Sequence, residues 1–291
     1  MREWVLGYAL GVREIAESKR QLERVREDLG AIYSTVANSE ELLSVLCDSS
    51  YRSKERSELI VDIFGSKTSS KLTVEVLREA VADEIPGDLR RTLHDLPEMF
   101  LASFNPEKIG FASTRKRVEG YALAQVRVDP SVDLASAESD LFKVARSIEN
   151  NASLRRLLSG VGSNAELRRG LVSDLFLARI GEVALKLILF AVQTSRVRDI
   201  VELLDDLVVL LATERGKGIA DVRSARELSQ RHREALLTVL EGVTSRSLEL
   251  RSRVQPSLVA GIVALVGDTL FDVSARRRLD EVRSLVADAI H

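Results

Sequence analysis

In this chain of 291 residues, the stretch Gly7-Tyr8-Ala9-Leu10 recurs as Gly120-Tyr121-Ala122-Leu123, 113 residues later. Further identities follow at an offset of 112, one residue less, as a difference in loop length allows. They pair Asn38 with Asn150, Leu42 with Leu154, Leu46 with Leu158, Asp62 with Asp174, and Phe64 with Phe176. A shared register this long indicates an internal duplication. Two copies are too few for a solenoid, so we expect two sister domains.

Each copy is predicted to be a bundle of short antiparallel helices, because apolar residues recur at steps of three and four. One stripe of the first copy consists of Leu22, Val25, Leu29, Ile32 and Val36. Asn38-Ser39 then supplies a helix cap, and Gly65 ends a later helix. Pro97, Pro106 and Gly110 interrupt the helical pattern, so the joint between the copies is expected there.

Beyond Gly218 the period changes. Residues 219–224 and 248–254 alternate as half-buried strands do, and residues 258–266 form an apolar run typical of a buried strand. Residues 269–271 are predicted to return as a hairpin, residues 227–240 to form a helix, and Ser274 to cap a final helix. The fold class is therefore mainly α, with two tandem helical bundles (residues 1–110 and 111–218) followed by a small α+β C-terminal domain (residues 219–291).

Composition excludes several classes of protein. The 42 basic and 44 acidic residues give a net charge of −2, which does not favour a nucleic-acid partner. Cys47 is the single cysteine and the three histidines are scattered, so we expect no disulfide framework and no metal site. No stretch has the length of a membrane span or the pattern of a signal peptide. No spacing of residues indicates a catalytic or cofactor-binding site.

The C-terminal third carries an ordered series of distinctive residues, which we call the signature positions. They are Pro256, Gly261, Gly267, Asp268, Asp272, Ser274, Arg276 and Leu279. Glycines here allow strands to approach closely and turns to adopt positive φ. The series resembles the C-terminal signature of the delta subunits of F-type ATP synthases, the family of the oligomycin-sensitivity-conferring subunit. Gln255, Ala260 and Val273 depart from that family's pattern, which has an acid at the first position and glycines at the other two.

The resemblance implies a non-catalytic stator subunit in the peripheral stalk. Such a subunit binds the N-terminal helices of the alpha subunits and ties the catalytic hexamer to the membrane-anchored b subunit, so that proton-driven rotation is coupled to ATP synthesis. It implies no cofactor, no nucleic acid and no small-molecule substrate, and a peripheral location on the cytoplasmic face of the bacterial cell membrane. The bundles would bind alpha subunits and the C-terminal domain would bind the b subunit. The signature positions would either support the fold or face a partner.

The duplicated helical domain makes the chain similar to the longer delta subunits of actinobacteria. Since no membrane helix precedes it, we expect the unfused form rather than the fused b–delta chain of mycobacteria. Two other interpretations stay open. The chain is a helical adaptor or scaffold subunit of another multiprotein complex, or it is an enzyme or ligand sensor with a polar cluster near Asp268, Asp272 and Arg276.

Overall fold

The computed structural model describes residues 1–66, 70–105, 115–159, 164–194, 200–258, 260–267 and 269–273. The chain divides into two compact units, Met1–Val208 and Val209–His291, and each is described by itself. The joint expected near Pro106 and Gly110 and the final helix expected from Ser274 lie outside the described residues.

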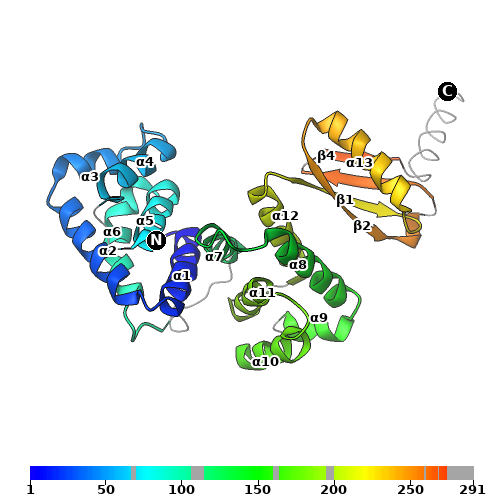
Figure 1. Ribbon diagram of the computed structural model, residues 1–291, viewed down its shortest axis with the longest axis horizontal. Coiled ribbons are helices and arrows are strands. Elements are labelled where there is room, and N and C mark those ends of the chain that lie inside the picture. The colour runs from blue at the N-terminus through cyan, green and yellow to red at the C-terminus, as the bar shows by residue number, and fades with distance from the viewer. Residues whose placement is uncertain are drawn as a thin grey trace, which may run out of the picture. The chain divides into compact units, whose positions relative to one another are not determined.

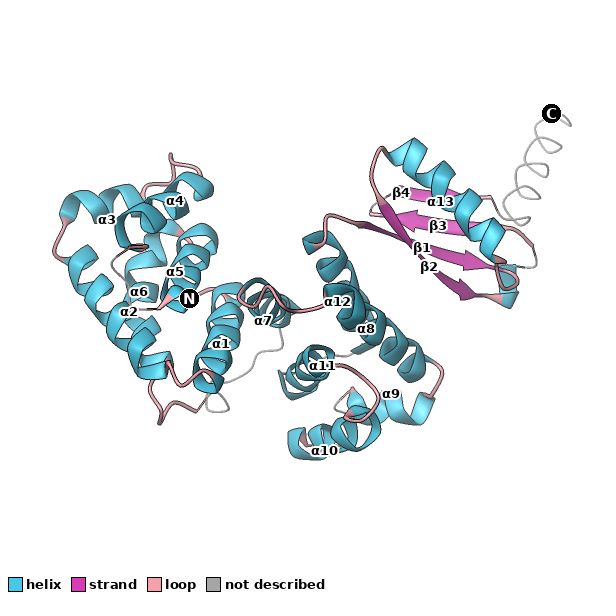
Figure 2. Ribbon diagram, in the orientation of Figure 1, coloured by secondary structure: helices cyan, strands magenta, loops and turns pink. Residues whose placement is uncertain are grey.

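The first unit is made of helices (Figures 1 and 2). Those of the first copy are α1 (Glu3–Ser18), α2 (Leu22–Ala37), α3 (Glu40–Cys47), α4 (Ser53–Phe64), α5 (Lys71–Asp83) and α6 (Leu89–Met99), with a short 3₁₀ turn at Pro86–Asp88. Those of the second copy are α7 (Arg115–Arg127), α8 (Leu134–Glu149), α9 (Ala152–Leu158), α10 (Ala165–Phe176), α11 (Glu182–Thr194) and α12 (Ile200–Glu214). Val208, the last residue of the unit, lies within α12.

The two copies repeat the same order of helices. Each helix of the second copy begins 111 or 112 residues after its counterpart, as Glu3 and Arg115 show for α1 and α7. The buried stripe of α2 (Val25, Leu29, Ile32 and Val36) has its counterpart in α8 (Ala137, Leu141, Val144 and Ile148). The duplicated sequence therefore folds into a duplicated bundle.

Side-chain caps mark the first turns of α3 and α9. The Ser39 hydroxyl accepts a hydrogen bond from the Leu42 backbone N–H, and the Asn151 side chain does the same for Leu154 in the second copy. Each cap satisfies a donor that the first turn leaves without an intrahelical partner.

The break expected at Pro97 is wrong, because Pro97 lies inside α6, which continues to Met99. Proline lacks the N–H that would bond to the carbonyl four residues back, and α6 ends two residues after it.

The second unit contains the last turns of α12, a four-stranded sheet and helix α13. Strands β1 (Gly218–Ser224), β2 (Leu248–Val254), β3 (Ile262–Val266) and β4 (Thr269–Asp272) lie in the order β2-β1-β3-β4. β1 pairs parallel with β2 and antiparallel with β3, and β3 pairs antiparallel with β4. Helix α13 (Gln230–Thr244) connects β1 to β2 and covers one face of the sheet (Figure 2). The core of this unit consists of Ala220, Val222, Leu240, Leu248, Ala264 and Val266.

The fold class predicted from the sequence is confirmed, and the strand over residues 248–254 has the predicted bounds. The strand predicted over residues 258–266 is shorter than expected. Pro256–Leu258 forms a 3₁₀ turn and Gly261 has a φ of 95°, so the backbone becomes extended only from Ile262. Helix α13 begins later than predicted, since the Ser229 hydroxyl caps it by accepting from the His232 N–H.

Candidate functional site

Four of the eight signature positions fall on described residues, and they frame the β3–β4 hairpin. Gly261 and Gly267 lie at opposite ends of β3 with φ values of 95° and 57°, a region that favours glycine. Pro256 opens the 3₁₀ turn, and Asp272 ends β4 opposite Val263. None of these four residues lines either of the two hollows described below. Asp268, Ser274, Arg276 and Leu279 lie outside the described residues, and so does most of the polar cluster that an enzyme would need.

The closest contact between the two helical copies joins α1 to α7, which lie side by side in Figure 1. A Cβ atom placed on Gly7 would lie 2.0 Å from the backbone oxygen of Arg117, and one on Gly120 would lie 2.3 Å from that of Trp4. Heavy atoms cannot approach so closely without a bond, so any side chain at either glycine would force the helices apart. Glycine at both positions lets the two backbones touch.

This contact is nearly symmetric. Trp4 and Arg117 are equivalent residues of the two copies, as are Gly7 and Gly120, and each glycine contacts the other copy's equivalent residue. A Cβ on Gly11 would lie 2.6 Å from the Cβ of its own counterpart, Ala124. A surface that meets an equivalent surface in this way is isologous, like the interface of a two-fold dimer. The copies are therefore related as two subunits of a dimer are, within one chain.

Polar contacts surround the packed glycines. The Arg117 guanidinium, whose side chain is 2% exposed, pairs with Glu3 at 2.5 Å, and Arg127 Nη1 donates to Glu79 Oε1 at 2.8 Å. Gln125 Nε2 donates to the backbone oxygen of Gly11 at 3.2 Å. Residues 117–126 of α7 are all buried, so this helix is enclosed on every side. The second copy is thus held against the first by packing and by ion pairs in which one partner is buried, Arg117 in the first and Glu79 in the second.

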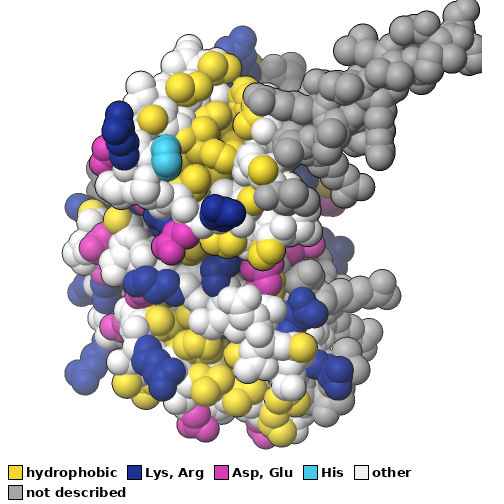
Figure 3. Space-filling view, turned by 90° about the vertical axis from the view of Figure 1, so that its right-hand side faces the viewer, with side chains coloured by type: hydrophobic (Ala, Val, Ile, Leu, Met, Phe, Trp, Pro, Cys, Tyr) yellow, Lys and Arg dark blue, Asp and Glu magenta, His cyan; other side chains and the backbone are white. Residues whose placement is uncertain are grey.

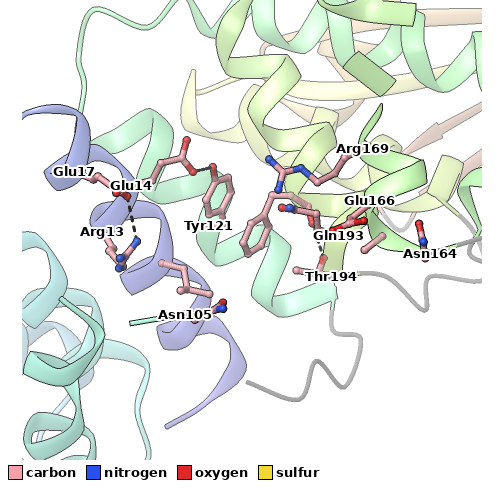
Figure 4. Close-up of a pocket in the computed structure, with 13 residues that line it drawn as sticks. Arg13, Glu14, Glu17, Asn105, Tyr121, Asn164, Glu166, Arg169, Gln193 and Thr194 are labelled. Carbon is pink, nitrogen blue, oxygen red and sulfur yellow. Dashed lines mark hydrogen bonds and ion pairs between the residues drawn. The ribbon is translucent and has the colours of Figure 1, made fainter. Parts of the chain in front are cut away.

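A pocket of about 660 Å³ lies within the same unit, between α1 and the helices α10 and α11 (Figure 4). The Tyr121 ring stacks on Phe190 with 3.8 Å between ring centroids, and its hydroxyl donates to Glu14. Burial, reinforced by the Glu14 carboxylate, raises the pKa of Tyr121 well above its usual value. Burial also raises the pKa of its counterpart Tyr8. Both phenols therefore stay protonated and serve as hydrogen-bond donors or packing groups rather than as bases.

The charges around this pocket are mixed. Arg13 pairs with Glu17 at 3.3 Å, while Glu166 and Arg169 come from α10. The one pairing of a hydroxyl with a carboxylate described for this pocket is that of Tyr121 with Glu14, and the raised pKa of the phenol keeps its proton in place. Sequence reasoning missed the pocket because its lining comes from residues as far apart as Leu10 and Thr194. The signal that could have found it is the repeated Gly-Tyr-Ala-Leu, which marks the two helices that meet there.

A second hollow, of about 410 Å³, opens between α8, α9 and α10, and we call it the α9–α10 groove. Its apolar lining consists of Leu154, Leu157, Leu171, Leu175 and Phe176. Arg179 and three small polar side chains complete it. In the part of the chain that the structure describes, no group of three or more His, Cys, Asp or Glu residues is arranged to hold a metal ion. Within that same part, every helix is too short or too polar to cross a bilayer.

Comparison with known families identifies both copies. The model of the ATP synthase delta (OSCP) subunit family matches residues 6–100 and residues 119–286. The two matches begin 113 residues apart, which is the offset between Gly7 and Gly120. The second match takes in a helical copy together with most of the C-terminal unit, whereas the first takes in a helical copy alone.

Individual relatives agree with this match. ATP synthase subunit delta of Corynebacterium aurimucosum is 27% identical over 90% of this chain and 88% of its own length. The one from Maricaulis maris is 29% identical over 96% of its own length and 58% of this chain. A chain of the Toxoplasma gondii mitochondrial ATP synthase hexamer aligns over 58% of this chain and 97% of its own, at 14% identity and a TM-score of 0.40. That last likeness is too weak to add to the assignment. On the strength of the family match across both copies, the chain belongs to the ATP synthase delta (OSCP) subunit family.

Proposed function

We propose that the chain is the peripheral-stalk delta subunit of an F1Fo ATP synthase, where it links the catalytic alpha/beta hexamer to the membrane-anchored b subunit. The observation that carries this proposal is the family match to residues 119–286, which spans a helical copy and most of the C-terminal unit without a break. Relatives that match about nine-tenths of the chain bear the name of the same subunit.

The proposed role is mechanical. Rotation of the central stalk would drag the hexamer around with it unless a second stalk held the hexamer still. A protein that resists this torque makes and breaks no bond and needs no cofactor. It needs rigid elements and partners that bind tightly, and nanomolar affinity corresponds to a free energy of binding of about −12 kcal/mol. A groove that takes the apolar face of an amphipathic helix is one way in which a helical bundle can bind a partner.

Each of the three predicted domains is assigned a partner. In this proposal, the bundles of residues 1–110 and 111–218 hold N-terminal helices of alpha subunits, and residues 219–291 hold b. The α1–α7 contact adds a constraint, because it joins the bundles into one body. Two docking sites at a fixed spacing raise avidity when the partner's sites match that spacing and lower it when they do not. The complex would then keep the chain at the cytoplasmic face of the membrane, as a peripheral subunit.

Copurification tests this proposal. We expect a tagged chain, recovered from gently solubilised membranes, to bring the alpha, beta and b subunits with it in constant proportion. Recovery with a different set of partners and none of these subunits would contradict the proposal. That result would favour the alternative, a helical adaptor or scaffold of another multiprotein complex.

A further inference from the structure

Helix α12 begins in the helical unit and ends in the C-terminal unit, so it is the segment through which the chain passes from one to the other. One face of it is apolar and buried, as Leu203, Leu204, Leu207 and Val208 are at most 2% exposed. Another face carries charged side chains that meet α7 and α8, and we call this set the α12 junction. It consists of Arg115 and Glu119 of α7, Arg146 of α8, and Glu202, Asp205 and Asp206 of α12.

Asp206 faces the beginning of α7. Arg115 Nε lies 2.5 Å from Asp206 Oδ2, and Nη2 of the same guanidinium donates to Glu202 Oε1 at 2.8 Å. One turn further along α7, the side chain of Glu119 is buried and pairs with Lys116 Nζ at 2.6 Å. One guanidinium is thus shared between two carboxylates of α12, and a third carboxylate lies close by.

Helix α8 makes the other polar contact of the junction. Arg146 Nη2 donates to both carboxylate oxygens of Asp205, and Nη1 donates to Glu149 at 2.5 Å. The Arg146 side chain is 15% exposed. This arginine therefore holds α12 against α8 through Asp205. Among the described residues, Arg115 is the cation in contact with Asp206.

The surroundings of Asp206 disfavour its ionised form. Its Oδ2 is buried, and no described group donates a hydrogen bond to it, because the Arg115 contact is not aligned as one. Charged groups usually lie in water, as on the face shown in Figure 3, where acidic and basic side chains are scattered over the surface. Burial of a carboxylate without donors is costly, and nearby carboxylates add to the cost. A proton on Asp206 removes both penalties.

These contacts determine the pKa of Asp206. Burial raises the pKa, Arg115 lowers it, and the carboxylates of Glu119, Glu202 and Asp205 raise it again, so that it moves from 3.8 to about 6. The folded chain therefore holds this proton more tightly than the unfolded chain does. The stability that the proton provides is lost as the pH rises from about 4 to about 6, and no more is lost above that range.

We propose that Asp206 is a proton-binding switch in the α12 junction, which fastens α12 to α7 more firmly when its surroundings become acidic. The charged groups that face Asp206 from the described elements are Arg115 and Glu119 of α7 and Glu202 and Asp205 of α12. With the proton bound, the junction carries one negative charge less and buries a neutral carboxyl group. With the proton released, α12 stays docked through its apolar face and Arg115, at a cost in free energy.

Nuclear magnetic resonance on the full-length chain tests the proposal directly. The chain is labelled with carbon-13 at its aspartate carboxyl groups, and the signal that disappears in Asp206→Asn is assigned to Asp206. We expect this signal to titrate with a midpoint at about pH 6. A midpoint below about pH 5, toward the ordinary range of aspartate, would overturn the proposal.

Two further variants locate the switch. Arg115→Gln removes the positive charge that lowers the pKa of Asp206, so the same signal should titrate at a higher pH than in wild type. Asp174→Asn is the control, since Asp174 is exposed on α10 and takes no part in the junction. It should leave the midpoint of Asp206 unchanged. A midpoint in Arg115→Gln equal to that of wild type would contradict the assigned contact.

Unfolding by urea measures the effect on stability. The equilibrium constant of unfolding is compared between wild type and Asp206→Asn at each pH, since the effect of the amide itself is the same at every pH. As the pH rises from about 4.5 to about 7, we expect wild type to lose stability relative to the variant by about tenfold or more in that constant. Above this range the ratio should stay constant. A ratio that does not change with pH at all would contradict the proposal.

The switch itself does not depend on which complex the chain joins, because each measurement uses the chain alone. Its use does rest on the proposed function. If the bundles hold alpha subunits and the C-terminal domain holds b, the load between them passes along α12, and acidification would fasten that connection. A chain that recovers the ATP synthase subunits but shows no titration of Asp206 near pH 6 would keep the proposed function and lose the switch. The reverse result would keep the switch and lose the proposed function.

Discussion

Alanine at Gly7 is expected to lower the free energy of unfolding of the helical unit by about 3 kcal/mol, at the upper end of overpacking costs. The added methyl group would lie 2.0 Å from the Arg117 backbone oxygen, and neither helix can yield without moving its whole backbone. Urea unfolding measured by tryptophan fluorescence reports this directly. Trp4 is the one tryptophan of the chain, and its backbone oxygen forms part of the same contact.

Gly30→Ala is the matched control for this result. Gly30 lies in α2, and a Cβ atom added there would have no neighbour within 4 Å. Alanine at this position should therefore raise stability by about 0.5–1 kcal/mol through its better helix propensity. Gly120→Ala should behave like Gly7→Ala, because the two residues are equivalent. If Gly7→Ala unfolded at the same urea concentration as wild type, the close contact between the copies would not exist in solution.

Alanine at Leu240 is expected to unfold the C-terminal unit while the helical unit stays folded. Leu240 is 3% exposed in a core of six buried residues, and removing a buried leucine side chain costs about 2–5 kcal/mol. A domain of this size has little stability to lose. Hydrogen exchange measured by mass spectrometry should show that β1 and β2 lose protection while α1 and α7 keep theirs.

The neighbouring residue provides the control. Val239 is 61% exposed on the same helix, so Val239→Ala should change stability by no more than about 0.5 kcal/mol. Loss of protection in α1 together with β1 in the Leu240→Ala variant would mean that the two units unfold as one. That outcome would contradict the division of the chain near residue 208.

Much of the fold could be predicted from the sequence because its signals are local. Strict alternation over residues 248–254 gave a strand with the observed bounds, and the spacing of Val25, Leu29, Ile32 and Val36 gave the buried face of α2. The errors have local causes too. Gly261 adopts positive φ, so β3 begins only at Ile262. Pro97 lies in the last turn of α6, and the helix does not end at it.

The surfaces could not be predicted in the same way. The repeated Gly-Tyr-Ala-Leu revealed the duplication but not the contact between its two occurrences, since no local spacing states which helices meet. The sequence does carry one sign of that contact, because each helix has two small residues four positions apart. They are Gly7 and Gly11 in α1, and Gly120 and Ala124 in α7. The groove was hidden for another reason, because Leu157 and Leu158 look alike in a stripe although one is exposed and the other buried.

In the function proposed above, this chain holds the catalytic hexamer against rotation. Its most direct test measures proton-driven ATP synthesis in membrane vesicles from cells that lack the chain, before and after the purified chain is added. We expect ATP hydrolysis by the hexamer to persist without the chain, synthesis to be lost, and the full-length chain to restore it. Synthesis at the normal rate in vesicles without the chain would contradict the claim.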